Sequence, residues 1–237
     1  MAKTAKEKFK TMHDVFDDFT NRNIYKMISQ GYFEGMIGPI SIGKESNVFA
    51  AKTKDGKVIV KIHRLETSDF NRIYDYIKYD PRYINIKKNR RLLIFAWAQR
   101  EYRNLLKARE AGVNVPKPIA FKFNIVLEEF IGDDEVAPQL KNSVPKDLSG
   151  FFDKTIENMR KMYKAGLIHT DLSPFNILNH NEEPVFIDYS QCTTIENPNS
   201  LEYLVRDIKN VCLFFRKRGM KIDEEEVLKK IVKKKNV

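Results

Sequence analysis

Apolar and polar residues alternate in short runs through residues 39–62, and this pattern predicts three successive β-strands. A turn at residues 43–47 separates the first two strands, and Asp55-Gly56 is a strong hairpin signal before the third. Another apolar strand covers residues 124–132 and ends in a glycine. We therefore expect a small antiparallel sheet in the first half of the chain, with a lobe boundary near residue 132.

Apolar residues at helical spacing occupy several longer segments. Residues 12–31 predict one or two helices, with a possible break at Thr20-Asn21. Residues 92–111 predict a long helix that Gly112 stops, and residues 148–165 predict another that Gly166 stops. Two more helices are expected near the C-terminus, the first capped by Ser200 and the second by Asp223. The second half of the chain is thus predicted to be mainly helical.

Two charged residues interrupt apolar patterns in the first half. Lys61 lies inside the third predicted strand, and Glu101 lies on the same helix face as Trp97 and Leu105. Because a buried charge without a partner is costly, the simplest arrangement pairs Lys61 with Glu101. The alternative is that each residue pairs locally or extends its charged end to water.

Residues 167–188 carry the strongest chemical signal. Asp171 follows a short apolar run, Asn176 comes five residues later, and Asp188 follows a second apolar run. A hairpin turn at residues 180–183 would return Asp188 to the end of the hairpin where Asn176 lies. Phosphoryl transfer needs one carboxylate for the attacking hydroxyl and oxygen donors for Mg²⁺, which these three residues supply. The alternative is that they are ordinary polar loop residues, because a short motif is a hypothesis until its context agrees.

Composition narrows the class of protein. The chain has 237 residues, 42% of them hydrophobic, which suffices for one large domain or two small lobes. We find no apolar run that could span a bilayer and no hydrophobic secretory signal, and the two cysteines have no metal-ligand spacing. We therefore expect a cytoplasmic protein with reduced thiols and no membrane contact.

The formal net charge is +10, and basic residues cluster before the helix at 92–111 and again near the C-terminus. Such clusters attract nucleic-acid phosphates. The alternative is a solvated surface rich in lysine and glutamate. Contact with RNA or a ribonucleoprotein is therefore a hypothesis that charge supports.

Taken together, the motifs resemble the RIO family of atypical kinases, from about Ser41 to Phe215. Five segments carry the resemblance: Gly43-Lys44-Glu45-Ser46-Asn47-Val48, Glu101-Tyr102-Arg103-Asn104-Leu105, Ala111-Gly112-Val113-Asn114-Val115-Pro116-Lys117-Pro118, His169-Thr170-Asp171-Leu172-Ser173-Pro174-Phe175-Asn176 and Ile187-Asp188-Tyr189-Ser190-Gln191. Asn47 and the Ser190-Gln191 pair resemble the type-one branch.

The resemblance implies an α+β, bilobal protein-kinase-like fold. Residues 1–36 would form helices that pack on the kinase domain, residues 37–130 the N-lobe with a flexible insertion at 64–90, and residues 131–237 a reduced, mainly helical C-lobe. It also implies use of ATP and Mg²⁺, with Mn²⁺ possible, by an autophosphorylating serine/threonine kinase of class EC 2.7.11.1 or an ATPase. Such a protein would be a monomer that acts on the pre-ribosomal small subunit and its rRNA.

The same resemblance assigns roles to residues. Asp171 would be the catalytic base, and Asn176 and Asp188 the metal ligands, with Asp188 itself open to phosphorylation. Nucleotide binding would involve Lys61, Glu101, Gly43, Lys44, Ser46, Val48, Ser173 and the hinge residues Glu129 and Ile131, which would bond the adenine through their backbone. Ser68 is a candidate autophosphorylation site.

Two positions depart from common kinase patterns. Thr170 stands where ordinary kinases carry an arginine, and Glu128 occupies the gatekeeper position, where a hydrophobic residue is expected. Little chain follows Asp188, so an extended peptide groove is not expected. The remaining alternatives are a small-molecule kinase of the aminoglycoside or choline type and a non-catalytic RNA-binding pseudokinase.

Overall fold

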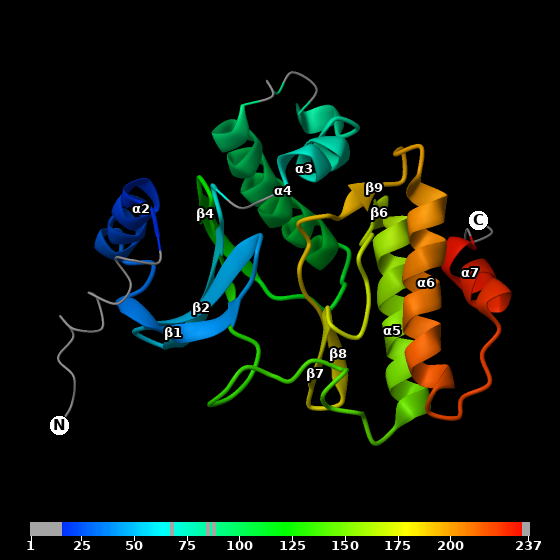
Figure 1. The fold of residues 1–237 in the computed structure, drawn as a ribbon. Helices are drawn as coiled ribbons and strands as arrows, with labels where there is room; N and C mark the ends of the chain where they lie inside the picture. The colour runs from blue at the N-terminus through cyan, green and yellow to red at the C-terminus, as the bar shows by residue number, and fades with distance from the viewer. Residues whose placement is uncertain (1–15, 67–68, 84–85, 87–88, 234–237) are drawn as a thin grey trace.

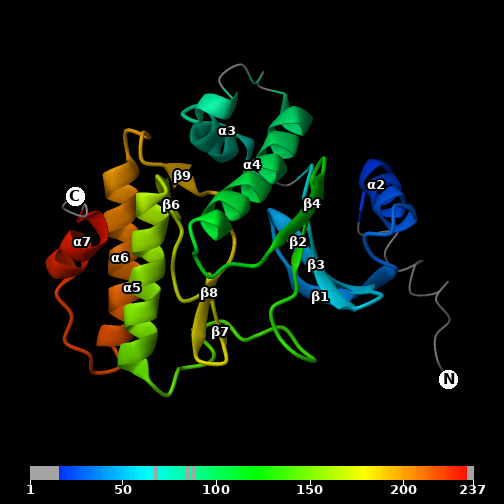
Figure 2. The ribbon, with the colours of Figure 1, turned by 180° about the vertical axis from the view of Figure 1, so that it is seen from behind.

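The structure is a computed structural model that describes residues 16–66, 69–83, 86 and 89–233. Ser68 and the beginning of the predicted N-terminal helical segment lie outside the described residues. Figures 1 and 2 show the sheet on one side of the molecule, the three C-terminal helices on the other, and helix α4 between them.

Five antiparallel strands form the N-terminal sheet, in the order β1-β2-β3-β5-β4. Their bounds are β1 Gly35–Ile42, β2 Ser46–Thr53, β3 Gly56–His63, β4 Pro118–Lys122 and β5 Ile125–Glu129. The predicted three-strand meander and the later strand are confirmed. Strand β4 was not predicted, because Pro118 was interpreted as part of a connection. A proline is tolerated as the first residue of an edge strand, and β4 lies at the edge.

Alternation along the strands divides the sheet into two faces. Val58, Val60 and Ile62 pack with Ile24 and Met27 of helix α2, Asp18–Ser29, in one apolar cluster. Side chains at the intervening positions, including Lys61, point to the opposite face. The helix therefore covers one face of the sheet and leaves the other free to line a cleft.

The possible break at Thr20-Asn21 is wrong, because both residues lie inside one continuous helix. The Thr20 N–H donates to Asp17 Oδ1 at 2.9 Å, and the Thr20 hydroxyl donates to Asp17 Oδ2 at 2.8 Å. Polar side chains that suggested a break instead complete the N-terminal cap.

The insertion between β3 and α4, Arg90–Glu110, contains helix α3, Phe70–Ile77, and a 3₁₀ turn, Pro81–Tyr83. Ile73 and Ile77 of α3 are buried in a cluster with Leu93, Ile94 and Trp97 of α4. The described part of the insertion is therefore packed on the long helix that carries Glu101.

The C-terminal half contains α5, Leu148–Lys164, α6, Ser200–Arg216, and α7, Glu224–Val232. Between α5 and α6 lie β6, Leu167–Ile168, which pairs with β9, Thr193–Thr194, and the hairpin of β7, Ile177–His180, with β8, Glu183–Phe186. Asp223 caps α7 as predicted, but Asn199 occupies the cap position of α6. The Ser200 hydroxyl instead donates to the Ile195 carbonyl at 2.9 Å. Among the described helices, none is both long and apolar enough to cross a membrane.

Candidate active site

Lys61 on strand β3 contacts both helix α4 and the segment that follows strand β8. Its ammonium lies 2.6 Å from Glu101 Oε1 on α4 and 2.9 Å from Asp188 Oδ1. The second Glu101 oxygen lies 2.8 Å from His63 Nε2. The predicted Lys61–Glu101 pair is present, and Asp188 and His63 add partners that sequence spacing did not indicate.

Electrostatics keep this cluster ionised. Burial acts to raise the pKa of Asp188, but the Lys61 ammonium and hydrogen bonds from Lys61 and Ser190 outweigh it and lower that pKa. The pKa of Glu101 is likewise lowered, because Lys61 and His63 outweigh the effect of burial. For Lys61, the two carboxylates overcome desolvation and raise its pKa. The lysine therefore carries a fixed positive charge at the junction of the lobes.

The β7–β8 hairpin brings Asn176 and Asp188 together, as predicted. The Ile187 N–H donates to the Asn176 carbonyl at 3.0 Å, which places Asp188 just beyond the hairpin stem. The Asn176 side-chain amide donates to the Asp171 carbonyl at 2.8 Å and to Asp171 Oδ2 at 3.2 Å. All three polar residues of the motif therefore lie in one connected group.

Asn176 and Asp188 each keep an oxygen for a cation. The Asn176 amide nitrogen is turned to Asp171, and Asp188 Oδ1 receives Lys61 and the Ser190 hydroxyl. Asn176 Oδ1 and Asp188 Oδ2 have no hydrogen bond within the described part of the chain. Two hard oxygen donors suit Mg²⁺, which also takes waters and phosphate oxygens, and Mn²⁺ accepts similar donors. In the described residues no three His, Cys, Asp or Glu side chains cluster as a metal site.

The loop that carries Asp171 is held by a buried carboxylate on α6. Asp207 accepts the Thr170 N–H at 2.8 Å and the Leu172 N–H at 2.9 Å. Thr170 has a φ of 69°, a left-handed conformation that is rare for a β-branched residue. Its hydroxyl donates to the Gln191 carbonyl at 3.0 Å. These bonds hold the strained backbone on either side of Asp171.

Asp207 was missed by the sequence analysis. The signal was present, because Asp207 lies on the same helical face as the buried residues Leu204 and Val211. This is the pattern that pointed to Glu101.

Asp171 itself has a raised pKa, through burial first and the Asp188 charge second, which makes it a stronger base than an exposed aspartate.

A cavity of about 680 Å³ opens between the lobes. Lys61, Asn176 and Asp188 line it, together with the predicted nucleotide-binding residues Gly43, Lys44, Ser46, Val48, Glu129 and Ile131. Glu101 lies behind Lys61. Asp171 and Ser173 are not lining residues, but Asp171 is bonded to Asn176 and Ser173 lies in the turn between them. The cavity thus has a charged end at Lys61 and an apolar part that includes Val48, Ile59 and Leu178.

Gly43 is required by a close approach in the turn over this cavity. Its N–H donates to the Ser46 carbonyl at 3.0 Å, and a Cβ at residue 43 would lie 2.9 Å from the same oxygen. A side chain there would push apart the turn between β1 and β2.

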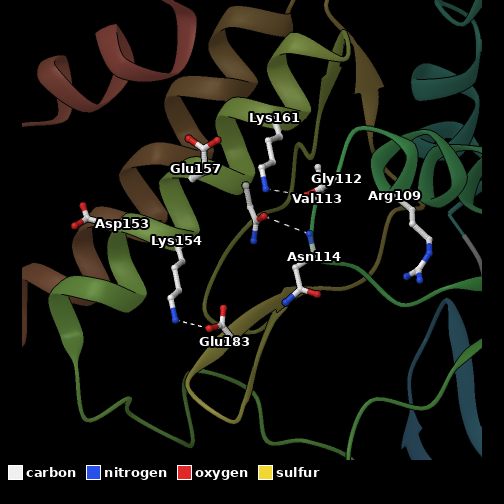
Figure 3. A pocket seen from close by; sticks show the side chains of 10 residues that line it. Arg109, Gly112, Val113, Asn114, Asp153, Lys154, Glu157, Lys161 and Glu183 are labelled. Carbon is white, nitrogen blue, oxygen red and sulfur yellow. Dashed lines mark hydrogen bonds and ion pairs between the residues drawn. The ribbon is translucent and has the colours of Figure 1, made fainter.

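A second cavity of about 640 Å³ lies between the end of α4, α5 and the β7–β8 hairpin (Figure 3). No residue of the predicted site lines it. There the Asn114 side chain donates to the Pro184 carbonyl at 3.0 Å, and the Asn114 carbonyl accepts the Phe186 N–H at 3.0 Å. Asn114 therefore holds the β7–β8 hairpin in place, and this hairpin positions Asn176 and Asp188.

Comparison with known proteins agrees with this geometry. The family described as the RIO domain matches residues 47–227, which include the site residues from Lys61 to Asp207. The chain belongs to the RIO family of atypical serine/threonine kinases. The resemblance inferred from the motifs is therefore confirmed.

Relatives of this RIO domain cover nearly the whole chain. A RIO-type serine/threonine-protein kinase Rio1 of Haloferax volcanii is 40% identical over 223 residues, 93% of this chain and 77% of the relative. Another of the same name, from Methanocaldococcus jannaschii, is 36% identical over 230 residues, 96% of this chain and 79% of the relative. The name Rio1 agrees with the type-one resemblance.

Among solved structures, the RIO domain is similar to the Rio2 kinase of Chaetomium thermophilum in its ADP/Mg²⁺-phosphoaspartate complex. The TM-score is 0.66 at 23% identity, over 90% of this chain and 66% of that chain. This likeness confirms the predicted bilobal, kinase-like α+β fold.

Proposed function

We propose that this chain binds Mg-ATP in the cavity between its lobes and transfers the terminal phosphate to a serine hydroxyl, including one of its own. The main support is the position of Lys61, which contacts both Glu101 and Asp188 and lies at the charged end of the cavity. This arrangement supports a bound triphosphate, because the cleft face of Lys61 offers a fixed cation beside two free oxygen donors.

In the proposed reaction Lys61 orients the phosphates, and the turn at Gly43–Ser46 covers them. Mg²⁺, held by Asn176 and Asp188, would neutralise charge on the phosphates when bound. Asp171 accepts the proton of the attacking serine hydroxyl, while Asn176 and the Asp207-bound loop keep its carboxylate in place. The backbone at Glu129 and Ile131 bonds the base.

The test is Asp171→Asn, assayed with labelled ATP. Phosphoryl transfer should fall at least about 100-fold, because the amide cannot accept the proton. Binding of Mg-ATP should stay within about twofold of wild type, because Asp171 does not line the cavity. Asp153→Asn, an exposed position on α5, is the matched control. Transfer at the wild-type rate in Asp171→Asn would show that Asp171 is not the base.

A second candidate activity is ATP hydrolysis through phosphorylated Asp188. The free Asp188 oxygen supports it, and the Chaetomium thermophilum Rio2 complex contains a phosphoaspartate. Acyl phosphates are cleaved by hydroxylamine, whereas phosphoserine is not. Labelled protein that loses its phosphate in hydroxylamine would support this route, and label that withstands the reagent would assign the phosphate to a hydroxyl.

We further propose that the chain acts as a cytoplasmic monomer in maturation of the small ribosomal subunit, in contact with rRNA. Support comes from exposed basic residues where α6 ends and α7 follows: Arg216, Lys217, Lys221, Lys229, Lys230 and Lys233. Binding to small-subunit rRNA should weaken steeply as salt increases, because each neutralised phosphate releases counterions. Salt-insensitive binding would exclude this surface as the contact.

A further inference from the structure

Glu128 is a buried acid on the wall of the nucleotide cavity. It pairs in register with Ile59 across β3 and β5, and Lys61 pairs with Val126. Side chains of Glu128, Ile59 and Lys61 therefore share the cleft face of the sheet. Glu128 lines the cavity, and it directly precedes Glu129, where the proposed base-binding backbone begins.

Among the described residues, no hydrogen bond or close ion pair reaches the Glu128 carboxyl, although the residue is only 8% exposed. Lys61 acts on it through its charge at longer range. Glu101, equally a buried acid on this side of the sheet, contacts both Lys61 and His63. Burial, with the Glu101 charge second, raises the pKa of Glu128 to about 8. A buried carboxyl without a hydrogen bond is costly, so the arrangement suits a ligand that supplies a donor.

The donor can be identified from the layout of the cavity. The triphosphate belongs at Lys61, Asn176 and Asp188, so the base occupies the apolar part beside Val48 and Leu178. The Ile131 carbonyl accepts the Ala137 N–H at 2.8 Å, so it is not available to the base. The Ile131 N–H has no hydrogen bond within the described residues and can donate to the base edge. Adenine has two hydrogens on its exocyclic amino group, and backbone at the hinge can accept one.

We propose that Glu128 accepts the other hydrogen and thereby selects nucleotides whose base carries an amino group at C6. The inference rests on the proposed nucleotide binding and adds a specificity-determining residue to it. A carboxyl keeps an accepting oxygen whether or not it is protonated, so the contact needs no particular charge state. A base without that amino group leaves Glu128 buried and unpaired.

The experiment measures dissociation constants by calorimetry for Mg-ATP and for Mg-purine riboside triphosphate, which lacks only the amino group. Wild type should bind ATP at least about tenfold more tightly. Glu128→Gln should keep that preference, because its amide oxygen still accepts. Glu128→Met should reduce it at least about threefold, because only the backbone acceptor at the hinge remains. Glu157→Gln, on α5 outside the cavity, is the control, and thermal unfolding verifies that each variant is folded.

Inorganic tripolyphosphate serves as a ligand without a base. Equal loss of tripolyphosphate and ATP affinity in Glu128→Met would overturn the inference, because Glu128 would then act through Lys61. Equal binding of the two nucleotides to wild type would overturn it as well and leave the proposed function standing. If wild type bound neither nucleotide nor tripolyphosphate, the proposed function would fail first.

Discussion

Replacing Lys61 with methionine should destabilise the protein through the acid that remains behind. Glu101 has a fully buried side chain, and within the described residues its ion pair is with Lys61, beside the hydrogen bond to His63. Removing one member of a buried ion pair costs about 3–5 kcal/mol, because the other charge is left uncompensated. Asp188 adds less, since 39% of its side chain is exposed and water can replace the lysine. We therefore expect Lys61→Met to lose about 3–5 kcal/mol at pH 8.

The loss should shrink in acid, and its sign follows from Glu101. Without the Lys61 charge, the effect of burial should dominate, so the pKa of Glu101 should rise above the ordinary value of 4.5. The folded variant then binds a proton that the unfolded chain does not, so its stability rises as pH falls toward 4.5. Wild-type Glu101 has a lowered pKa and gains nothing over this range. The difference between the two proteins should be smaller at pH 5.5 than at pH 8.

Urea unfolding followed by tryptophan fluorescence measures both effects. The chain has one tryptophan, Trp97, which is 2% exposed and lies one helical turn before Glu101. Combining Lys61→Met with Glu101→Gln removes both charges and should return the free energy of unfolding to within about 1.5 kcal/mol of wild type. A loss below about 1 kcal/mol for the single variant, or a loss independent of pH, would refute the reasoning.

Three more outcomes follow from the site. Asp207→Asn should lower the rate of phosphoryl transfer at least about tenfold and leave the Mg-ATP affinity unchanged, because an amide cannot accept the N–H groups on both sides of Asp171. Steady-state kinetics would measure the rate, and calorimetry would measure the affinity. If Asp207 had a purely structural role, the Mg-ATP affinity would fall as well. Gly43→Ala should weaken Mg-ATP binding about tenfold, because the added methyl group forces the turn open. A titration with Mg-ATP would measure the affinity, and an affinity equal to that of wild type would contradict this prediction. Burial lowers the pKa of His169 to about 4 from 6.5, so the unfolded chain takes up a proton that the folded state resists. The free energy of unfolding should therefore fall by up to about 3 kcal/mol between pH 6.5 and pH 4, as urea unfolding of wild type would measure. If His169→Asn lost the same amount, another group would be responsible.

Periodicity along the chain was sufficient for the parts of the fold that depend on one element at a time. Strand patterns identified the meander and the charged Lys61 inside its third strand, and helical spacing identified Glu101 on an apolar helix face. Each apolar pattern states which face of an element is buried. Where two such patterns each contained one charge of opposite sign, their pairing could be predicted although 40 residues separate them.

Tertiary structure decided the contacts that no local pattern contains. Asp188 reaches Lys61 across 127 residues of sequence, and Asp207 reaches the loop around Asp171 from a helix 35 residues or more away. Glu128 has no hydrogen bond among the described residues, because the pairing of β3 with β5 turns it toward the cavity rather than toward a donor. Spacing fixes which residues share a face, but the approach of one element to another depends on how whole apolar surfaces fit together, and that is a property of the folded chain.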